Sequence, residues 1–582
     1  MGSSGGNNKI RFLASLLGHR PQKRVLIINV FMDDRRVYLP NSFKVPQTMA
    51  PVYLAGAFSR TGCRVRIYNE HRSGPLKDKS LLAWPDMLVL TGVITGFDRM
   101  LHMVAYAKTL NPKVITVAGG PAIRALPKYS REFFDYACQG DVEQMQEVIA
   151  DAWGREWADP EMTPRYDLLP RFHPVDYLET SRNCNFRCGF CSLTAERNEY
   201  QKYSLKNMEK QLRAMKPGRH LCFIDNNFYG DDREFFLARV DLLQWFYKRG
   251  HFKSWSALVT HDFFLDFENL DRARESGCES LFSGVESFDR AELESYQKRQ
   301  NLLLPQMAAI HRCLQSGIVF HYGLMFDPSR RSVRELRSEI DLFLSAPGIT
   351  LPSFISLTIP FLGTPYFEEC VRENRLLPRL KLRDLDGFTQ TMKPVDPPEA
   401  VASLVRDLLS FRRYRRKVLR KAWEVWKTHR GNLSVFQRLQ TLVNVFNLCA
   451  PHWINSPGRF PRMPAGRTYI STTEPLDPVY RPLFPVHSRY RDYFKPTLVT
   501  DDGGRLTEAL LNDYQPDGSR LKEKDPPPLL SAIGFLAPHR VETPTRHTEK
   551  DQKSFVFIGR LLTPSGKNMK RGKRRILTLR IS

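Results

Sequence analysis

The sequence predicts an α/β fold in which two regions of alternating strands and helices precede a mainly helical and irregular C-terminal region. Short apolar runs alternate with helical stretches from residue 24 to 153, and again from 175 to 377. This alternation is typical of parallel sheets whose strands are joined by helices. The chain has 582 residues, which is too long for one hydrophobic core.

We therefore expect six consecutive regions. A flexible N-terminus precedes a domain built on a doubly wound parallel sheet, and a linker connects that domain to a second α/β domain. A helical and irregular C-terminal domain follows, and the chain ends in a basic tail that we expect to be mobile. In chain order the predicted bounds are 1–23, 24–153, 154–174, 175–377, 378–548 and 549–582.

The first α/β region contains glycine-bearing loops after its strands. Its strands are predicted over 24–30, 64–69, 86–95 and 113–118, and its helices over 46–60 and 99–110. Ligands of doubly wound sheets bind at the carboxyl ends of the strands, where glycine allows close approach of the backbone. The candidate loops are therefore 91–96, 119–122 and 140–143.

The second α/β region supplies six predicted strands. These strands are 177–180, 220–224, 255–260, 280–283, 319–325 and 354–359, with helical stretches such as 233–248, 268–275 and 302–316 between them. The loop after the first strand contains Cys184, Cys188 and Cys191 in the spacing C-x3-C-x2-C. A cysteine loop at the end of a strand lies on the face where barrel enzymes place their chemistry.

The three cysteines predict a [4Fe–4S] cluster with one open coordination site. Three thiolates on one loop can hold three irons, whereas clusters usually take four cysteines, and no fourth stands nearby. An open site is typical of a catalytic metal. Structural zinc would require a fourth Cys or His at regular spacing, and His173 and His220 are poorly placed for it. The other seven cysteines are scattered, which indicates a reducing compartment and no disulfide framework.

The formal net charge of +25 comes largely from residues 411–430 and 567–580. Such stretches can meet nucleic acid or anionic lipid, and the alternative is a solvated basic face, which we favour for the tail. For the predicted helix 399–427, one interpretation is a helix on a membrane surface, and the favoured one is a helix docked on the barrel. With no run of eighteen apolar residues and no signal peptide, we expect a cytoplasmic protein, peripheral to a membrane at most.

The cysteine spacing and the Phe190-Cys191 pair resemble the radical S-adenosylmethionine (SAM) enzymes, and six strand–helix units resemble their partial (β/α)6 barrel of TIM type. The resemblance implies that the open iron chelates SAM. It also implies that Phe190 packs near the adenine and that strand-end residues complete the SAM site. These residues are Asp225, Ser256, Gly284, Glu286 and Ser287.

The preceding region resembles the Rossmann-like cobalamin (B12)-binding domain of one radical SAM subfamily, the class B methyltransferases. The matches are residues 51–55, 91–93, 117–121 and 140–143. The implied cobalamin contacts are Thr91, Gly92, Val93, Gly119, Gly120, Pro121 and Gly140. The sequence departs from many cobalamin proteins, because no His follows the first strand at 31–36, so we expect cobalamin without a histidine lower ligand. The alternative is a sheet domain that has lost cobalamin.

The resemblance implies a radical SAM C-methyltransferase. A 5′-deoxyadenosyl radical would activate an unactivated substrate carbon, methylcobalamin would deliver the methyl group, and a second SAM would restore it. An external donor of the flavodoxin or ferredoxin kind would reduce the cluster. The alternative is a radical SAM enzyme that catalyses a cyclisation or rearrangement. An RNA-modifying enzyme is disfavoured, because the related RNA-modifying enzymes carry a second cysteine triad. We expect no nucleic-acid partner. Small-molecule, lipid and peptide substrates stay open.

Overall fold

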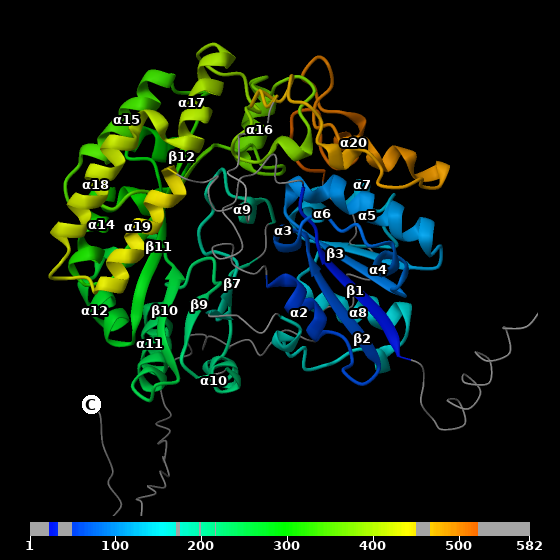
Figure 1. Ribbon diagram of the computed structural model, residues 1–582, viewed down its shortest axis with the longest axis horizontal. Coiled ribbons are helices and arrows are strands. Elements are labelled where there is room, and N and C mark those ends of the chain that lie inside the picture. Colours follow the sequence, from blue (N-terminus) through cyan, green and yellow to red (C-terminus); the bar gives the residue numbers. More distant parts are fainter. Residues whose placement is uncertain are drawn as a thin grey trace, which may run out of the picture. The chain divides into compact units, whose positions relative to one another are not determined.

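The computed structural model describes residues 22–32, 49–169, 175–196, 199–215, 217–449 and 466–521, and it is built around two parallel sheets (Figure 1). The predicted mobile tail and nearly all of the predicted flexible N-terminus lie outside these residues. The predicted fold class is confirmed: a doubly wound sheet precedes a partial barrel, and a helical C-terminal region follows. No helix in the described ranges combines the length and the apolar character that crossing a membrane requires.

The first sheet has five parallel strands in the order β2-β1-β3-β4-β5. Its strands are β1 (Lys23–Asn29), β2 (Cys63–Asn69), β3 (Met87–Thr91), β4 (Ile115–Gly119) and β5 (Tyr136–Cys138). Its helices are α2 (Ala50–Gly56), α3 (Glu70–Ser73), α4 (Lys79–Ala83), α5 (Phe97–Leu110), α6 (Pro121–Ala125), α7 (Pro127–Ser130) and α8 (Met145–Ala152). Every residue of β3 is buried, as expected for a central strand of a sheet covered on both faces.

Two predictions in this sheet differ from the structure, and a third element, β5, was not predicted. The strand predicted over 86–95 ends at Thr91, because Gly92 follows and Ile94–Gly96 forms a 3-10 turn. The helix predicted over 46–60 is the shorter α2, and residues 46–48 lie outside the described ranges. Strand β5 has only three residues and therefore lacks the length of apolar run by which a strand is recognised.

The second sheet has six parallel strands in the order β13-β12-β11-β10-β9-β6. Its strands are β6 (Val175–Leu178), β9 (Arg219–Phe223), β10 (Phe252–Leu258), β11 (Cys278–Glu286), β12 (Val319–Phe326) and β13 (Phe354–Leu357). The helices around it are α9 (Ser192–Glu196), α10 (Leu205–Ala214), α11 (Arg233–Tyr247), α12 (Phe267–Glu275), α13 (Arg290–Ser295), α14 (Gln306–Gln315), α15 (Val333–Ser345) and α16 (Pro365–Arg372). All six predicted strands are present. A short antiparallel pair, β7 (Ser181–Arg182) with β8 (Gln201–Lys202), follows β6.

Helices α17 (Pro398–Ser410), α18 (Arg415–Thr428) and α19 (Val435–Cys449) follow the second sheet. The single helix predicted over 399–427 is two helices, because Phe411 caps α17 in the left-handed conformation with φ of 47°. Helix α18 docks on the barrel: the Nζ of Lys421 donates to the carbonyl oxygen of Ala346, and the backbone N–H of Gly348 donates to Glu424.

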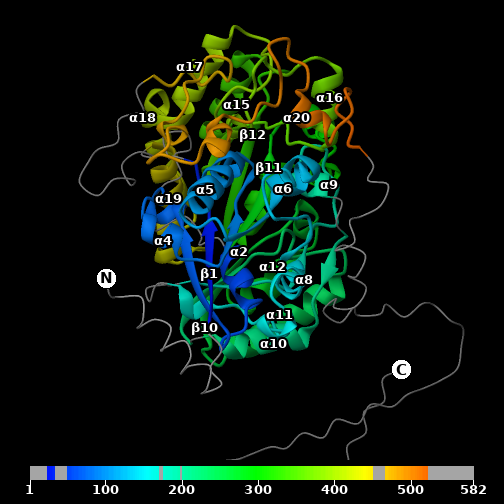
Figure 2. The same cartoon turned by 90° about the vertical axis from the view of Figure 1, so that its right-hand side faces the viewer.

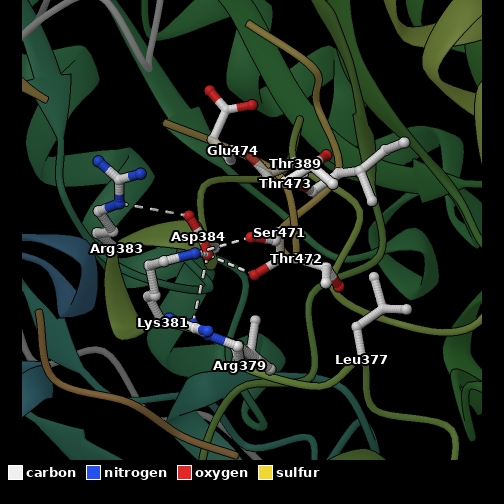
Figure 3. Close-up of polar contacts among 12 residues, drawn as sticks. Leu377, Arg379, Lys381, Arg383, Asp384, Thr389, Ser471, Thr472, Thr473 and Glu474 are labelled. Carbon is white, nitrogen blue, oxygen red and sulfur yellow. Dashed lines mark hydrogen bonds and ion pairs between the residues drawn. The ribbon is translucent and has the colours of Figure 1, made fainter. Parts of the chain in front are cut away.

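Residues 466–521, here called the C-terminal strap, run between the two sheet domains and are drawn in orange near α16 and α5 (Figures 1 and 2). The strap contains two 3-10 helices, at Pro478–Tyr480 and Ser488–Phe494, and one short α-helix, α20 (Glu508–Leu511). On the barrel side its anchor is a buried polar cluster in which Asp384 meets Ser471, Lys381 and Arg383 (Figure 3). On the other side, the backbone N–H of Thr497 donates to Asp98 (3.2 Å) and Tyr514 donates to the carbonyl oxygen of Ala125 (2.8 Å). The strap thus contacts both domains.

Candidate functional site

The strand leading into the cysteine loop is fixed by a buried ion pair. The carboxylate of Asp225 accepts hydrogen bonds from the backbone N–H of Thr180 (2.8 Å) and the hydroxyl of Ser181 (2.7 Å). The guanidinium of Arg239 lies 3.4 Å from it, and both side chains are fully buried. Burial raises the pKa of Asp225, whereas the charge of Arg239 opposes this shift. These partners give Asp225 a structural role at the base of the loop, and its contact with SAM stays a prediction.

The cysteine loop lies between β7 and α9. Cys188 is buried, and its sulfur accepts a hydrogen bond from the Nε2 of Gln300 at 3.3 Å. The sulfur of Cys184 accepts from the backbone N–H of Phe186 at 3.5 Å. Burial raises the pKa of Cys191 to about 11, and the positive charge of Lys298 works against this shift.

The loop fits a cluster held by three thiolates. All nine cysteines with described side chains are free thiols. Within the described ranges no three His, Cys, Asp or Glu side chains converge on a single metal ion. The side chains of Cys184, Cys188 and Cys191 lie close enough for their charges to influence one another, as three thiolates that each bind a different iron of one cluster would. The hydrogen bonds from Gln300 and Phe186 are of the kind that tune cluster potentials.

Glu286 and Lys298 form a buried ion pair that faces the cysteines. Glu286 ends β11 at a bulge with φ of 63°, and its carboxylate contacts the Nζ of Lys298. Burial alone would lower the pKa of Lys298, but the charges of Glu286 and Cys188 together raise it. The Nζ of Lys298 also lies 5.8 Å from the ring centre of Phe190. The structure therefore brings the cysteines, Phe190 and Glu286 together around Lys298.

The other predicted SAM residues have different surroundings. A Cβ on Gly284 would lie 2.2 Å from the carboxylate of Glu286, so only glycine leaves room for the ion pair. The hydroxyl of Ser287 donates to Glu339 (2.7 Å) and thereby joins β11 to α15. The hydroxyl of Ser256 lies 3.1 Å from the Nε2 of His220. Contacts of these three residues with SAM stay predictions.

A cavity of about 340 Å³ lies between the first sheet and the cysteine loop. Five of the seven predicted cobalamin residues line it, namely Thr91, Gly119, Gly120, Pro121 and Gly140. Gly92 and Val93 do not line it, and the side chain of Val93 is 55% exposed beside it. From the barrel side the lining includes Arg182, Asn183 and Leu193, which flank the cysteine loop.

The backbone at the edge of this cavity is suited to a large planar cofactor. Gly120 has φ of 105°, and a Cβ there would lie 2.9 Å from the carbonyl oxygen of Gly92. A Cβ on Gly140 would lie 2.9 Å from the side-chain oxygen of Gln144. Glycine at both turns keeps the carboxyl ends of β4 and β5 free of side chains, as expected where a cofactor approaches a doubly wound sheet. These glycine turns suit the approach of a cofactor such as cobalamin to the sheet edge, and the cavity of about 340 Å³ would hold only part of it.

An ion cluster joins the two domains at the cavity. Arg182, at the start of the cysteine loop, pairs with Glu179 (2.7 Å) of the same domain and with Glu143 (2.8 Å) of the first. From the first domain, Arg124 pairs with Asp141 at 2.6 Å and contacts Glu196 of α9. Hydrogen bonds and charge from Glu179 raise the pKa of Arg182 despite its burial. The loop 140–143, predicted as a cofactor loop, thus also forms the domain contact.

Sequence reasoning missed Lys298, Gln300, Arg124 and Arg182. Gln300 lies in a 3-10 segment after α13 and Lys298 directly precedes that segment, more than 100 residues from the cysteines. A charged residue in an irregular segment carries no periodic signal, and its partner is set only by the fold. The signal available for Arg182 was its place two residues before Cys184, at a strand end.

Two family models match the chain. The model described as the radical SAM superfamily matches residues 178–339, and the model described as the B12 binding domain matches residues 36–150. The first match contains the cysteine loop, Glu286 and Lys298, and the second contains all seven predicted cobalamin residues. A radical SAM domain implies SAM and a [4Fe–4S] cluster, and a B12 binding domain implies cobalamin, so the predicted cofactor set is confirmed.

Relatives match this chain at low identity. An uncharacterized methyltransferase of Synechocystis sp. is 24% identical over 55% of this chain, which spans 62% of that relative, less than two thirds of it. The hopanoid C-2 methylase of Rhodopseudomonas palustris is 22% identical over 68% of this chain and 75% of its own length. A solved structure of OxsB, a cobalamin-dependent S-adenosylmethionine radical enzyme, matches with a TM-score of 0.50 and 15% identity. That match covers 75% of this chain and 74% of OxsB, and it shows a shared fold.

Proposed function

We propose that this chain is a cobalamin-dependent radical SAM enzyme that transfers a methyl group to an unactivated carbon of a small-molecule, lipid or peptide substrate. When bound, the cluster and SAM would supply a 5′-deoxyadenosyl radical, and cobalamin would supply the methyl group. Two relatives are named as methyltransferase and methylase, one of them for carbon C-2 of a hopanoid. These names support a carbon methylation.

The observation that carries the proposal is the shared boundary of the two cofactor sites. The cavity beside Gly119 and Gly120 is also lined by Asn183, the residue before Cys184, and by Leu193, two residues after Cys191. A cofactor in this cavity would therefore lie against the cysteine loop. Methyl transfer needs that proximity, because the substrate carbon must meet both the radical and the methyl donor.

The described residues support specific roles in this reaction. Cys184, Cys188 and Cys191 would hold the cluster, and Phe190 with Glu286 would bind SAM. Lys298 keeps Glu286 in place and adds a positive charge beside three thiolates, whose negative charge it would offset. Arg182 and Arg124 hold the first domain over the barrel and line the cavity between them.

The proposal includes partners outside the chain. A cytoplasmic electron donor of the flavodoxin or ferredoxin kind would reduce the cluster. With a lipid substrate, the enzyme would bind peripherally at a membrane surface. Nucleic acid is not among the proposed partners.

The test is the metal content of the full chain, purified anaerobically after growth with hydroxocobalamin. We expect cobalt and a full cluster of iron in each chain. With SAM and a strong reductant, we expect both 5′-deoxyadenosine and S-adenosylhomocysteine, because the methylating reaction consumes SAM in both ways. The control is the triple variant Cys184→Ala, Cys188→Ala, Cys191→Ala, which should keep cobalt and lose iron.

Two results would contradict the proposal. A triple variant that retained its iron would show that the cluster lies elsewhere. Iron without cobalt, or 5′-deoxyadenosine without S-adenosylhomocysteine, would indicate a radical SAM enzyme that does not methylate.

A further inference from the structure

The hairpin of α18 and α19, residues 412–449, is the most positively charged part of the described chain. It contains ten Lys and Arg residues and one acidic residue, Glu424, so its formal charge is ten minus one, or +9. The total for the whole chain is +25. The single carboxylate is already used, because Glu424 pairs with Lys421 at 2.6 Å.

Only one face of this hairpin is needed for docking on the barrel. Val418, Ala422 and Val425 of α18 are buried, and Lys421 reaches the carbonyl oxygen of Ala346. On α19, Asn444 donates to the carbonyl oxygen of Leu351 at 2.9 Å, which fixes that helix beside the sheet. The opposite faces of both helices have no such partners among the described residues.

Those opposite faces expose large apolar side chains. Spacings of three, four and eight residues place these side chains on one side of each helix. The exposed set is Leu419 (53%), Trp423 (59%), Val435 (59%), Phe436 (63%), Leu439 (49%) and Val443 (37%).

Exposed arginines flank this apolar set. Arg416 and Arg420 are one turn apart on α18 and lie beside the stripe of Leu419 and Trp423. No acidic side chain of the described residues pairs with either, whereas the exposed Arg213 of α10 pairs with Glu209 at 2.6 Å. The Nζ of Lys427 lies 4.9 Å from the ring centre of Trp423.

We infer that the α18–α19 hairpin docks on an anionic phospholipid surface, with its apolar face in the headgroup layer. Basic residues beside Trp, Phe and Leu on an amphipathic helix are the combination that anionic membranes bind. A second copy of this chain is a poor occupant, because a two-fold interface would bring +9 against +9. A nucleic acid is also a poor occupant, because its bases could stack on Trp423 and Phe436 but would leave the exposed aliphatic side chains of Leu419, Val435 and Leu439 without a role. This inference rests on the proposed function only for the lipid class of the substrate.

The experiment is co-sedimentation of the full chain with phosphatidylcholine vesicles, with and without phosphatidylglycerol. We expect binding to the anionic vesicles that weakens as salt is added. The variant Arg416→Glu, Arg420→Glu and the variant Trp423→Ser, Phe436→Ser should each lower the partition coefficient at least about tenfold. The conservative variant Arg416→Lys, Arg420→Lys should bind like the unmodified chain.

Matched controls carry the same changes elsewhere. Lys113→Glu with Lys248→Glu changes as much charge on exposed residues, and Trp245→Ser with Phe267→Ser removes equally large exposed side chains. Both controls should bind fully. Equal loss in hairpin and control variants, or a hairpin variant that changes the oligomeric state and not vesicle binding, would overturn the inference. The vesicle assay measures no turnover. Its result therefore does not depend on whether the methylation assay succeeds.

Discussion

Gly120 is where the backbone beside the cavity leaves no space for a side chain. It has φ of 105° and ψ of −177°, a conformation that is essentially restricted to glycine. A Cβ there would also lie 2.9 Å from the carbonyl oxygen of Gly92. Gly74 has a similar conformation, with φ of 75° and ψ of 177°, but nothing within 4 Å of a Cβ. Substitutions at Gly74 and Gly120 therefore separate the cost of backbone strain from the cost of the steric contact with Gly92.

We therefore expect Gly120→Ala to destabilise the protein more than Gly74→Ala. Strain alone should cost Gly74→Ala about 1–3 kcal/mol, and the contact with Gly92 adds to this for Gly120→Ala. Urea unfolding measures both free energies, and the absorbance of bound cobalamin should fall only for Gly120→Ala. Equal free energies of unfolding for the two variants would contradict the close approach seen here.

At the scale of elements, α5 and the C-terminal strap meet at a buried carboxylate. Asp98 is 1% exposed, accepts a hydrogen bond from the backbone N–H of Thr497, and contacts the hydroxyl of Tyr480. Burial raises the pKa of Asp98 to about 6, although these hydrogen bonds and the charge of Arg383 oppose the shift. The contact therefore depends on pH.

The sign follows from the two pKa values of Asp98, about 6 in the folded chain and 3.8 in the unfolded chain. Between them the unfolded chain has lost a proton that the folded chain retains, so stability falls as pH rises to about 6 and then levels off. A shift of this size corresponds to about 3 kcal/mol. Asp98→Asn removes this titration. The free energy of unfolding of the variant minus that of the unmodified chain should therefore be higher at about pH 7 than at about pH 4.

Urea unfolding at both pH values measures this difference. The exposed carboxylate of Asp492, in the same strap, gives the control Asp492→Asn, which should show the same free energy relative to the unmodified chain at both pH values. A pH-independent effect of Asp98→Asn would show that the Asp98 carboxyl does not titrate as described.

Most strands could be predicted from the sequence, because buried parallel strands are continuous apolar runs such as Met87–Thr91. The break at Phe411 could not, because a non-glycine residue in the left-handed conformation carries no composition signal. The strap could not be predicted either. Its contacts, such as Tyr514 with Ala125, join residues 389 positions apart and follow from the assembled domains alone.

At the scale of the whole molecule, the cysteine motif identified the cluster site, but the arrangement of the two cofactor sites required the structure. Cys184 and Glu286 lie in recognisable motifs, whereas Lys298 gains its importance only from the fold that brings it to them. Likewise, the place of Arg182 near Cys184 is visible in the sequence, but its role as a domain contact follows only from the fold, in which the two domains meet at its guanidinium. The contact at Arg182 makes domain association testable.

We expect Arg182→Met to loosen the two domains. Glu179 and Glu143 would lose their cation in a partly buried site, and the domain contact should weaken by about 2 kcal/mol. Hydrogen exchange should accelerate both in the loop 140–143 and in β6. The control is Arg165→Met, because Arg165 is 13% exposed like Arg182 but pairs with the nearby Asp167. If both variants exchanged alike, the ion cluster would not hold the domains together.

The course of the strap also sets an order of assembly during synthesis. Helix α5 leaves the ribosome well before its cover, the strap, which is the last of the described segments in chain order. Until then the face of α5 that carries Asp98 has no strap against it, and the first domain is attached to the barrel without its final clamp. In the interval between translation of β5 and of the strap, the two domains around the nascent cavity therefore lack the contacts that the strap makes with both. Arg520 supplies two of them, because it donates to the carbonyl oxygens of Arg124 and of Ala195, so a corrinoid delivered in that interval would arrive before this last bridge between the domains forms.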